Sequence, residues 1–139
     1  MKHIRLTIFC LTVICVTVLS SCNSSDQMIY YSEKENYISS TGVVDYVQYT
    51  VDGIYIGFSE LDYEFDDTCF KIVGENAEIV QRQNIKDKLK MGSVVTIVTA
   101  PKYFGDGYVM PIVSIIINDE VLLDFEQGHE NLLKWLQCD

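Results

Sequence analysis

The chain has few basic residues, and this scarcity excludes some classes of partner. Ten Lys and Arg stand against 20 Asp and Glu, which gives a net charge of −10 at pH 7. Proteins that bind nucleic acids rely on Lys and Arg to displace counterions from the phosphates. Attraction to an anionic lipid surface needs the same residues. The charge balance therefore argues against nucleic acid as a partner, and against membrane binding through charge alone.

Histidine is also scarce, which leaves little material for a metal site or for acid–base catalysis. The two histidines are His3 and His129, and one histidine with separated cysteines makes no recognisable four-ligand zinc set. The sequence contains no Gly-x-Ser-x-Gly nucleophile turn. Gly105-Asp106-Gly107 lacks the Gly-Lys-Ser/Thr that follows in a phosphate-binding loop. The sequence predicts no enzyme activity and no cofactor, and His129, at the start of an expected terminal helix, is predicted to be exposed or capping.

The first apolar run is too short to cross a bilayer and has the layout of an export signal. It extends from Leu6 to Leu19, about 14 residues, whereas a spanning helix needs roughly 20. Lys2 and Arg5 precede it, and small polar residues follow. A basic start, a short apolar centre and small residues before a cut are typical of a secretory signal peptide.

The end of this run, Leu19-Ser20-Ser21-Cys22, resembles the lipobox of bacterial lipoproteins. The resemblance implies that Cys22 is diacylated and that residues 1–21 are then removed. Two or more acyl chains, each contributing about 0.8 kcal/mol per buried methylene, make such an anchor persistent. A conventionally cleaved signal and an uncleaved anchor are the alternatives. Whether the anchor lies in the inner membrane, the outer membrane or the cell surface stays open.

Removal of the 21-residue signal from the 139-residue chain would leave 118 residues, the size of one domain. The signal contains two of the ten basic residues and none of the 20 acidic ones, so the net charge of the mature chain would be −12. Of the five cysteines, Cys69 and Cys138 would remain unmodified. A disulfide between them and two free thiols are both open alternatives.

Residues 22–36 begin with small polar residues and are predicted to form a tether, with Tyr30 and Tyr31 able to dock on the domain. The domain itself is predicted to occupy residues 37–139. Alternating and β-branched residues predict strands at 41–50, 54–61, 69–73, 93–100 and 108–118, the last being the longest, and a short strand at 120–125. Asp52-Gly53 predicts a type I′ hairpin turn. One helix, capped by Asn76 and broken near Asn84, and a terminal helix at 129–137 complete the pattern.

This order, with a helix between the third and fourth strands, is that of the OB-fold, a five-stranded Greek-key barrel. The segment LKMGSVVTIV resembles the entry to the fourth strand of OB domains. The chain is similar over residues 38–117 to small exported OB-like lipoproteins, including the tRNA-anti-like group. The resemblance implies an α+β, mainly β domain with an OB-like barrel and a short C-terminal helix. A β-sandwich or another small α+β meander is the alternative.

The acidic stretch 60–67 is the first candidate site. Asp62, Glu64 and Asp66 alternate, so in an extended strand their carboxylates would lie on one face and could bind Ca²⁺. Their spacing is not that of an EF-hand loop. A solvated acidic loop and a docking patch for a basic partner are the alternatives.

The second candidate site is aromatic. Tyr103, Phe104 and Tyr108 surround a Gly-Asp-Gly turn, and Asp52 lies in the first hairpin turn. In OB-folds these two loops flank the ligand-binding face. We therefore expect them to form one binding surface, with packing over the open end of the barrel as the alternative.

Together these features predict a non-enzymatic lipoprotein of the bacterial cell envelope that is anchored through Cys22. Its expected partner is an envelope protein or another macromolecule. A sensor of Ca²⁺ or a small ligand that uses residues 60–67 is one alternative function. An acidic immunity or inhibitor lipoprotein directed against a basic toxin or hydrolase is another.

Overall fold

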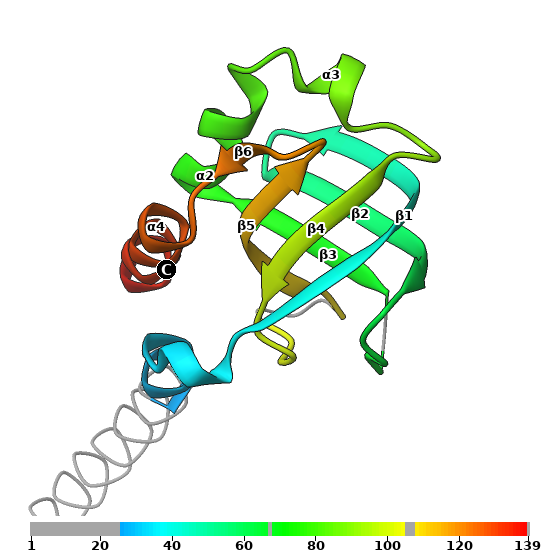
Figure 1. Cartoon of the computed structure of the whole chain (residues 1–139). Coiled ribbons are helices and arrows are strands. Elements are labelled where there is room, and N and C mark those ends of the chain that lie inside the picture. The colour runs from blue at the N-terminus through cyan, green and yellow to red at the C-terminus, as the bar shows by residue number, and fades with distance from the viewer. Residues whose placement is uncertain (1–25, 67, 105–107, 139) are drawn as a thin grey trace, which may run out of the picture.

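The computed structural model describes residues 26–66, 68–104 and 108–138, and this part of the chain is α+β and mainly β, as predicted. A six-stranded, mainly antiparallel sheet curves around the core, and helices lie to its left and above it in Figure 1. The strands are β1 (Ile38–Thr50), β2 (Gly53–Leu61), β3 (Cys69–Val73), β4 (Val94–Thr99), β5 (Met110–Ile117) and β6 (Glu120–Leu123). The helical elements are η1 (Lys34–Asn36), α2 (Gly74–Gln81), α3 (Ile85–Lys88) and α4 (Phe125–Cys138), and residues 26–32 are also helical.

The strand pairings close on themselves. The sheet order is β3-β2-β1-β4-β5-β6, and β3 pairs in addition with β5. This last pairing is parallel, whereas the others are antiparallel. The long strand β1 pairs with β4 through its first half and with β2 through its second half. Five strands therefore form a ring, and β6 extends it at β5.

The predicted first hairpin is confirmed, although its turn is of another type. Thr50 pairs with Gly53, and Gly53 has φ +147, a conformation that L side chains rarely adopt. A type I′ turn would need positive φ at Asp52 as well, but Asp52 is not in that region. The Thr50 hydroxyl instead accepts a hydrogen bond from the Asp52 amide, 3.2 Å between the heavy atoms. Alternation along β2 is as predicted, with Ile54, Ile56 and Phe58 buried.

The prediction that the strand after residue 108 is the longest is wrong. β1 has 13 residues and β5 has 8. The long apolar run suggested a long strand, but it is apolar because β5 is buried on both faces. The core inside the ring lies against one face, and α4 with the N-terminal residues lies against the other. Strands covered on both sides read as continuous apolar sequence whatever their length. Pro111 lies at the start of β5, where a missing amide donor is tolerated.

The helix between β3 and β4 is broken near Asn84, as predicted. Asn84 has φ 52, a left-handed conformation that separates α2 from α3. The expected capping by Asn76 is wrong, because α2 begins earlier, at Gly74. Asn76 is fully buried: its side-chain amide donates to the Gly128 carbonyl at 2.8 Å and its oxygen accepts from Asn131 at 3.0 Å. An asparagine that resembled a cap therefore joins α2 to α4.

The terminal helix α4 begins at Phe125 and lies against β5 and α2 (Figure 1). Asp124 caps it by accepting hydrogen bonds from the amides of Glu126 and Gln127, at 3.1 and 3.3 Å. Gly128 makes the close approach to β5 possible, since a Cβ there would lie 1.8 Å from the Val113 carbonyl oxygen. Helix α4 is thereby held directly on the strand.

We expect Gly128→Ala to destabilise the protein by about 2 kcal/mol or more, because overpacking against fixed backbone forces the helix away from β5. Urea unfolding followed by circular dichroism measures the change. Gln127→Ala, at an exposed position of the same helix turn, is the matched control and should be nearly neutral. Equal stability of Gly128→Ala and Gln127→Ala would contradict the close packing of α4 on β5.

Candidate functional site

The two candidate stretches of the sequence meet at one end of the molecule and line a single cavity. Its volume is about 320 Å³, near the lower end of the range of about 300–1,000 Å³ typical of ligand sites. The loop that follows β2 supplies one wall, and the loop between β4 and β5 supplies the other. We call this the loop cavity; it is lined by Tyr63, Glu64, Phe65, Asp66, Pro101, Lys102, Tyr103 and Met110.

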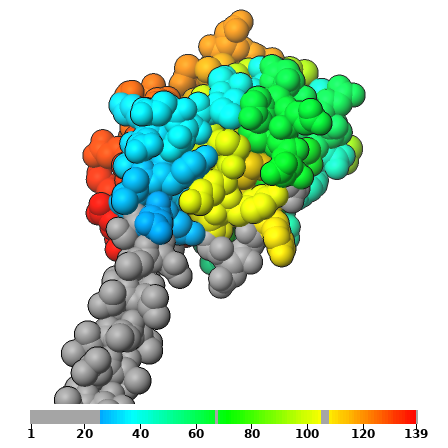
Figure 2. Space-filling model, turned by 90° about the horizontal axis from the view of Figure 1, so that it is seen from below, coloured from blue at the N-terminus to red at the C-terminus, as the bar shows by residue number. Residues whose placement is uncertain are grey.

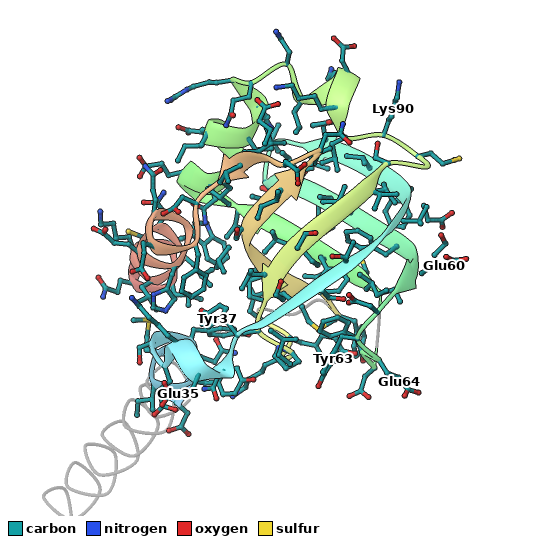
Figure 3. All side chains as sticks on the ribbon, in the orientation of Figure 1. Glu35, Tyr37, Glu60, Tyr63, Glu64 and Lys90 are labelled. Carbon is teal, nitrogen blue, oxygen red and sulfur yellow. The ribbon has the colours of Figure 1, made fainter. Side chains whose placement is uncertain are left out.

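Views of this end show which segments surround the cavity. In Figure 2, which looks onto it from below, the loop at 101–104 lies between the N-terminal residues and those around 62–70. In Figure 3, Tyr63 and Glu64 lie at this end, as do Glu35 and Tyr37, whereas Lys90 lies at the opposite end. The cavity is therefore beside the N-terminal segment.

Asp62 anchors the acidic wall to β1. Its Oδ1 accepts hydrogen bonds from the Ser40 hydroxyl at 2.5 Å and from the Thr41 amide at 2.9 Å. In return, the Asp62 amide donates to the Thr41 carbonyl at 3.0 Å, and the Tyr63 amide donates to the Ser40 hydroxyl oxygen at 3.2 Å. These hydrogen bonds, that from Ser40 first, hold the pKa of Asp62 below its usual value. Asp62 thus sets where the loop leaves β2.

Aromatic packing fixes the rest of this wall. The ring of Tyr63 lies 4.5 Å from that of Phe65, which in turn lies edge-on to Phe70 at 5.4 Å. Phe70 is fully buried and contacts Phe58 at 5.4 Å inside the ring of strands. A continuous series of rings therefore runs from the exposed Tyr63 into the core, so the aromatic side of the cavity packs on buried residues of the fold.

The loop between β4 and β5 divides its aromatic residues between core and surface. Phe104 is buried and packs edge-on against Trp135 at 5.5 Å. Tyr103 packs partly on the main core and lines the cavity. Tyr108 is 77% exposed, and its ring lies 5.7 Å from that of Tyr103. Of the three predicted aromatic binding residues, Tyr103 therefore lines the cavity, Tyr108 lies beside Tyr103 at the surface, and Phe104 is buried against α4.

Residues 26–36, expected to form part of a tether, pack on the fold and hold this loop. Tyr31 is fully buried, and its hydroxyl donates to the Lys102 carbonyl at 2.8 Å. The Lys102 ammonium lies over the ring of Tyr30, 4.6 Å from its centre. Burial raises the pKa of Tyr31 and of Tyr37 well above the ordinary value, so both hydroxyls remain hydrogen-bond donors. The Tyr37 hydroxyl donates to the Tyr31 carbonyl at 2.7 Å.

The expectation that His129 is exposed or caps a helix is wrong. His129 is 6% exposed, and its Nε2 lies 2.7 Å from the Tyr31 carbonyl oxygen, so this nitrogen carries the proton and donates. Its ring stacks on Phe125 and meets the edge of Tyr37. His129 therefore joins α4 to the N-terminal segment. Local sequence pattern does not reveal this long-range contact.

Glu64 and Asp66 are exposed at the cavity, and neither forms an ion pair with a described residue. The loop is not an extended strand, so the one-face arrangement expected for Asp62, Glu64 and Asp66 is absent. Among residues 26–66, 68–104 and 108–138 there is no group of three or more His, Cys, Asp or Glu that could hold a metal ion. The geometry therefore does not favour the Ca²⁺ hypothesis.

Asp52, expected beside the aromatic loop, lines a different cavity. We call this the turn cavity; its volume is about 570 Å³, and it shares no described lining residue with the loop cavity. It lies between the first hairpin turn and helices α2 and α4, with Lys71, Glu78 and Trp135 among its lining residues. Gly74, at φ 56, admits Trp135 here, since a Cβ would lie 2.7 Å from the indole.

Of the two alternatives left open for Cys69 and Cys138, the structure shows two free thiols. The Cys69 sulfur lies 3.0 Å from the Tyr46 hydroxyl, and Cys138 is exposed near the end of α4. Cys22, the predicted lipidation residue, lies outside the described residues.

Sequence reasoning missed several residues of the site: Tyr63, Phe65, Lys102 and Met110 line the cavity, and Tyr31 positions it. Their signal was present in part, because Tyr63 and Phe65 alternate with the carboxylates that drew attention to the stretch.

Comparison with known proteins gives no relative: no protein-family model, no curated protein and no solved structure matches this chain. Within the described residues, no helix combines the length and apolar character that crossing a membrane requires.

We expect the stability conferred by the Asp62 carboxylate to depend on pH. Because its pKa is lowered by folding, this contribution is present above the unfolded-state value of 3.8 and is lost as the pH falls through the lower folded-state value. The stability difference between wild type and Asp62→Asn should therefore narrow as the pH falls below 3.8, as measured by urea unfolding. Asp45→Asn is the control, since that exposed carboxylate has no hydrogen bond with a described residue. A difference that stays constant with pH for Asp62→Asn would contradict the anchoring role.

Proposed function

We propose that this chain is a lipoprotein of the bacterial cell envelope, anchored through Cys22, that binds another macromolecule and is not an enzyme. The signal layout of residues 1–21 and the lipobox-like Leu19-Ser20-Ser21-Cys22 support the anchor. The scarcity of histidine and the lack of a recognisable nucleophile motif support a binding role over a catalytic one.

The domain is proposed to be an OB-like barrel. The ring β1-β2-β3-β5-β4 with its parallel β3–β5 pairing, and the helices between β3 and β4, support this assignment. The loop cavity involves the loop between β4 and β5, one of the two loops that flank the ligand face in such barrels.

The observation that carries the proposed function is the convergence of the two loops in one aromatic cavity. Tyr63, Phe65 and Tyr103 come from separate segments, and the cavity they line is held in place by Asp62 and Tyr31. Exposed aromatic rings on a rigid support give much contact area at low entropic cost, which is why tyrosine is enriched where proteins bind one another. We infer that the partner binds there.

Under this proposal, the position of the N-terminal segment determines how the loop cavity is oriented relative to the membrane. Asp26 follows Cys22 by four residues, a distance of at most about 14 Å for an extended chain. Tyr30 and Tyr31, a few residues later, contact the cavity wall at Lys102. An anchor at Cys22 would hold the loop cavity close to the membrane surface, so the partner would also have to reach that surface.

Lipidation at Cys22 is tested by labelling. Cells that express the full chain should incorporate radiolabelled palmitate into it, and Cys22→Ser should abolish the label, whereas Cys69→Ser, which changes a cysteine of the folded domain, should retain it. Label that persists in Cys22→Ser would contradict the proposed anchor.

Binding through the loop cavity is tested with the exposed rings. Tyr63→Ala and Tyr108→Ala should each reduce crosslinking of the anchored protein to its envelope partner at least fivefold, because the rings supply the contact area. Tyr55→Ala, which removes a tyrosine of β2 that lies against Lys71, is the control and should have no effect. Unchanged crosslinking in both Tyr63→Ala and Tyr108→Ala would place the binding surface elsewhere. Thermal melts establish that each variant is folded.

A further inference from the structure

We propose that the loop cavity binds a cationic side chain, the guanidinium of Arg or the ammonium of Lys, presented by a basic protein partner. The inference rests on the proposed binding function and names the chemistry that the cavity recognises. It is argued from the lining of the cavity, from the interactions that the chain already makes with its own lysines, and from charge.

The lining has the composition of a site for a long cationic side chain. Tyr63, Phe65 and Tyr103 present rings, Met110 a thioether, and Glu64 and Asp66 carboxylates. The faces of aromatic rings attract cations, and Arg and Lys carry apolar stems that pack on such surfaces. A volume of about 320 Å³ holds a side chain rather than a folded element.

This chain already uses tyrosine faces to hold ammonium groups. Lysine nitrogens lie over tyrosine rings at 4.8, 5.3 and 4.6 Å from the ring centres in three pairs: Lys71 with Tyr55, Lys86 with Tyr49, and Lys102 with Tyr30. No described lysine lies in this way over Tyr63 or Phe65. The faces of Tyr63 and Phe65 are therefore not occupied by a described lysine.

The carboxylates at the cavity are likewise not neutralised within the described residues. The four described ion pairs are Lys34 with Glu126, Arg82 with Glu78, Lys88 with Glu120, and Lys134 with Glu130, and none involves Glu64 or Asp66. Among the described residues that line the cavity, Lys102 is the one cation, and its ammonium lies over Tyr30. A cation from outside would find both carboxylates available.

The charge of the whole chain favours the same occupant. A net charge of −10, or −12 after loss of the predicted signal, attracts basic proteins and repels acidic ones over distances of about 10 Å at ordinary salt. The negative charge brings a basic partner to the surface, and the cavity selects one of its side chains.

The experiment titrates the full chain in detergent with three peptide probes of equal length, rich in Gly-Arg, Gly-Lys and Gly-Glu. We expect the two basic probes to bind and the acidic probe not to bind. Glu64→Gln/Asp66→Asn should weaken binding of the basic probes at least tenfold. Glu75→Gln/Asp87→Asn, which makes the same change of net charge on α2 and α3, should weaken it less than twofold.

A second pair of variants tests the ring face. Tyr63→Phe keeps the ring and should bind the Gly-Arg probe as wild type does, whereas Tyr63→Leu keeps an apolar side chain of similar bulk and should bind it about fivefold more weakly. Equal loss in both double carboxylate variants would mean attraction by net charge alone and would overturn the proposal. So would equal binding by Tyr63→Phe and Tyr63→Leu, or binding of phosphatidylcholine vesicles in place of the basic peptides.

Failure of this inference is distinguishable from failure of the proposed function. If Tyr63→Ala and Tyr108→Ala abolish crosslinking to the envelope partner but the carboxylate variants do not, the cavity is the binding site and its ligand is not a cation. If none of these variants changes crosslinking, the loop cavity is not the binding site.

Discussion

Tyr31 is the residue on which the arrangement of the site depends. It is fully buried, its carbonyl oxygen lies within hydrogen-bond distance of Tyr37 and His129, and its hydroxyl donates to Lys102. One residue, through its backbone carbonyl and its side-chain hydroxyl, therefore joins the N-terminal segment, helix α4 and the loop between β4 and β5. A buried carbonyl or hydroxyl left without its partner costs about 1–3 kcal/mol, so these contacts stabilise the packing of the three parts on one another. This junction holds the loop between β4 and β5, which forms one wall of the loop cavity.

The distribution of charge follows from the scarcity of basic residues. With so few Lys and Arg in an acidic chain, most of them are engaged in ion pairs or lie over tyrosine rings. The carboxylates at the loop cavity are left facing solvent, next to rings that rest on the core through Phe70. The carboxylates of Glu64 and Asp66 need no ion-pair partner beside these rings because water solvates them. The same arrangement makes the loop cavity receptive to a cation.

Sequence pattern predicted the elements well wherever a local signal decides them. The alternation along β2, the turn glycine at Gly53 and the break at Asn84 are all properties of a few neighbouring residues. The parts that could not be predicted are long-range. Asn76 and His129 resemble a cap and an exposed residue in their local context, but tertiary contacts with α4 and with Tyr31 bury them. The meeting of residues 63–66 with residues 101–103 depends likewise on the parallel pairing of β3 with β5, which no local pattern contains.

The central claim is that the loop cavity, and not the larger turn cavity, is the site that takes the partner's cationic side chain. Mapping of amide chemical shifts in the isotopically labelled chain, during titration with the Gly-Arg peptide, tests it directly. The account predicts that the saturating shifts fall on residues 63–66 and 101–104. Saturating shifts confined to residues 50–53 and the Trp135 indole, which line the turn cavity, would contradict it.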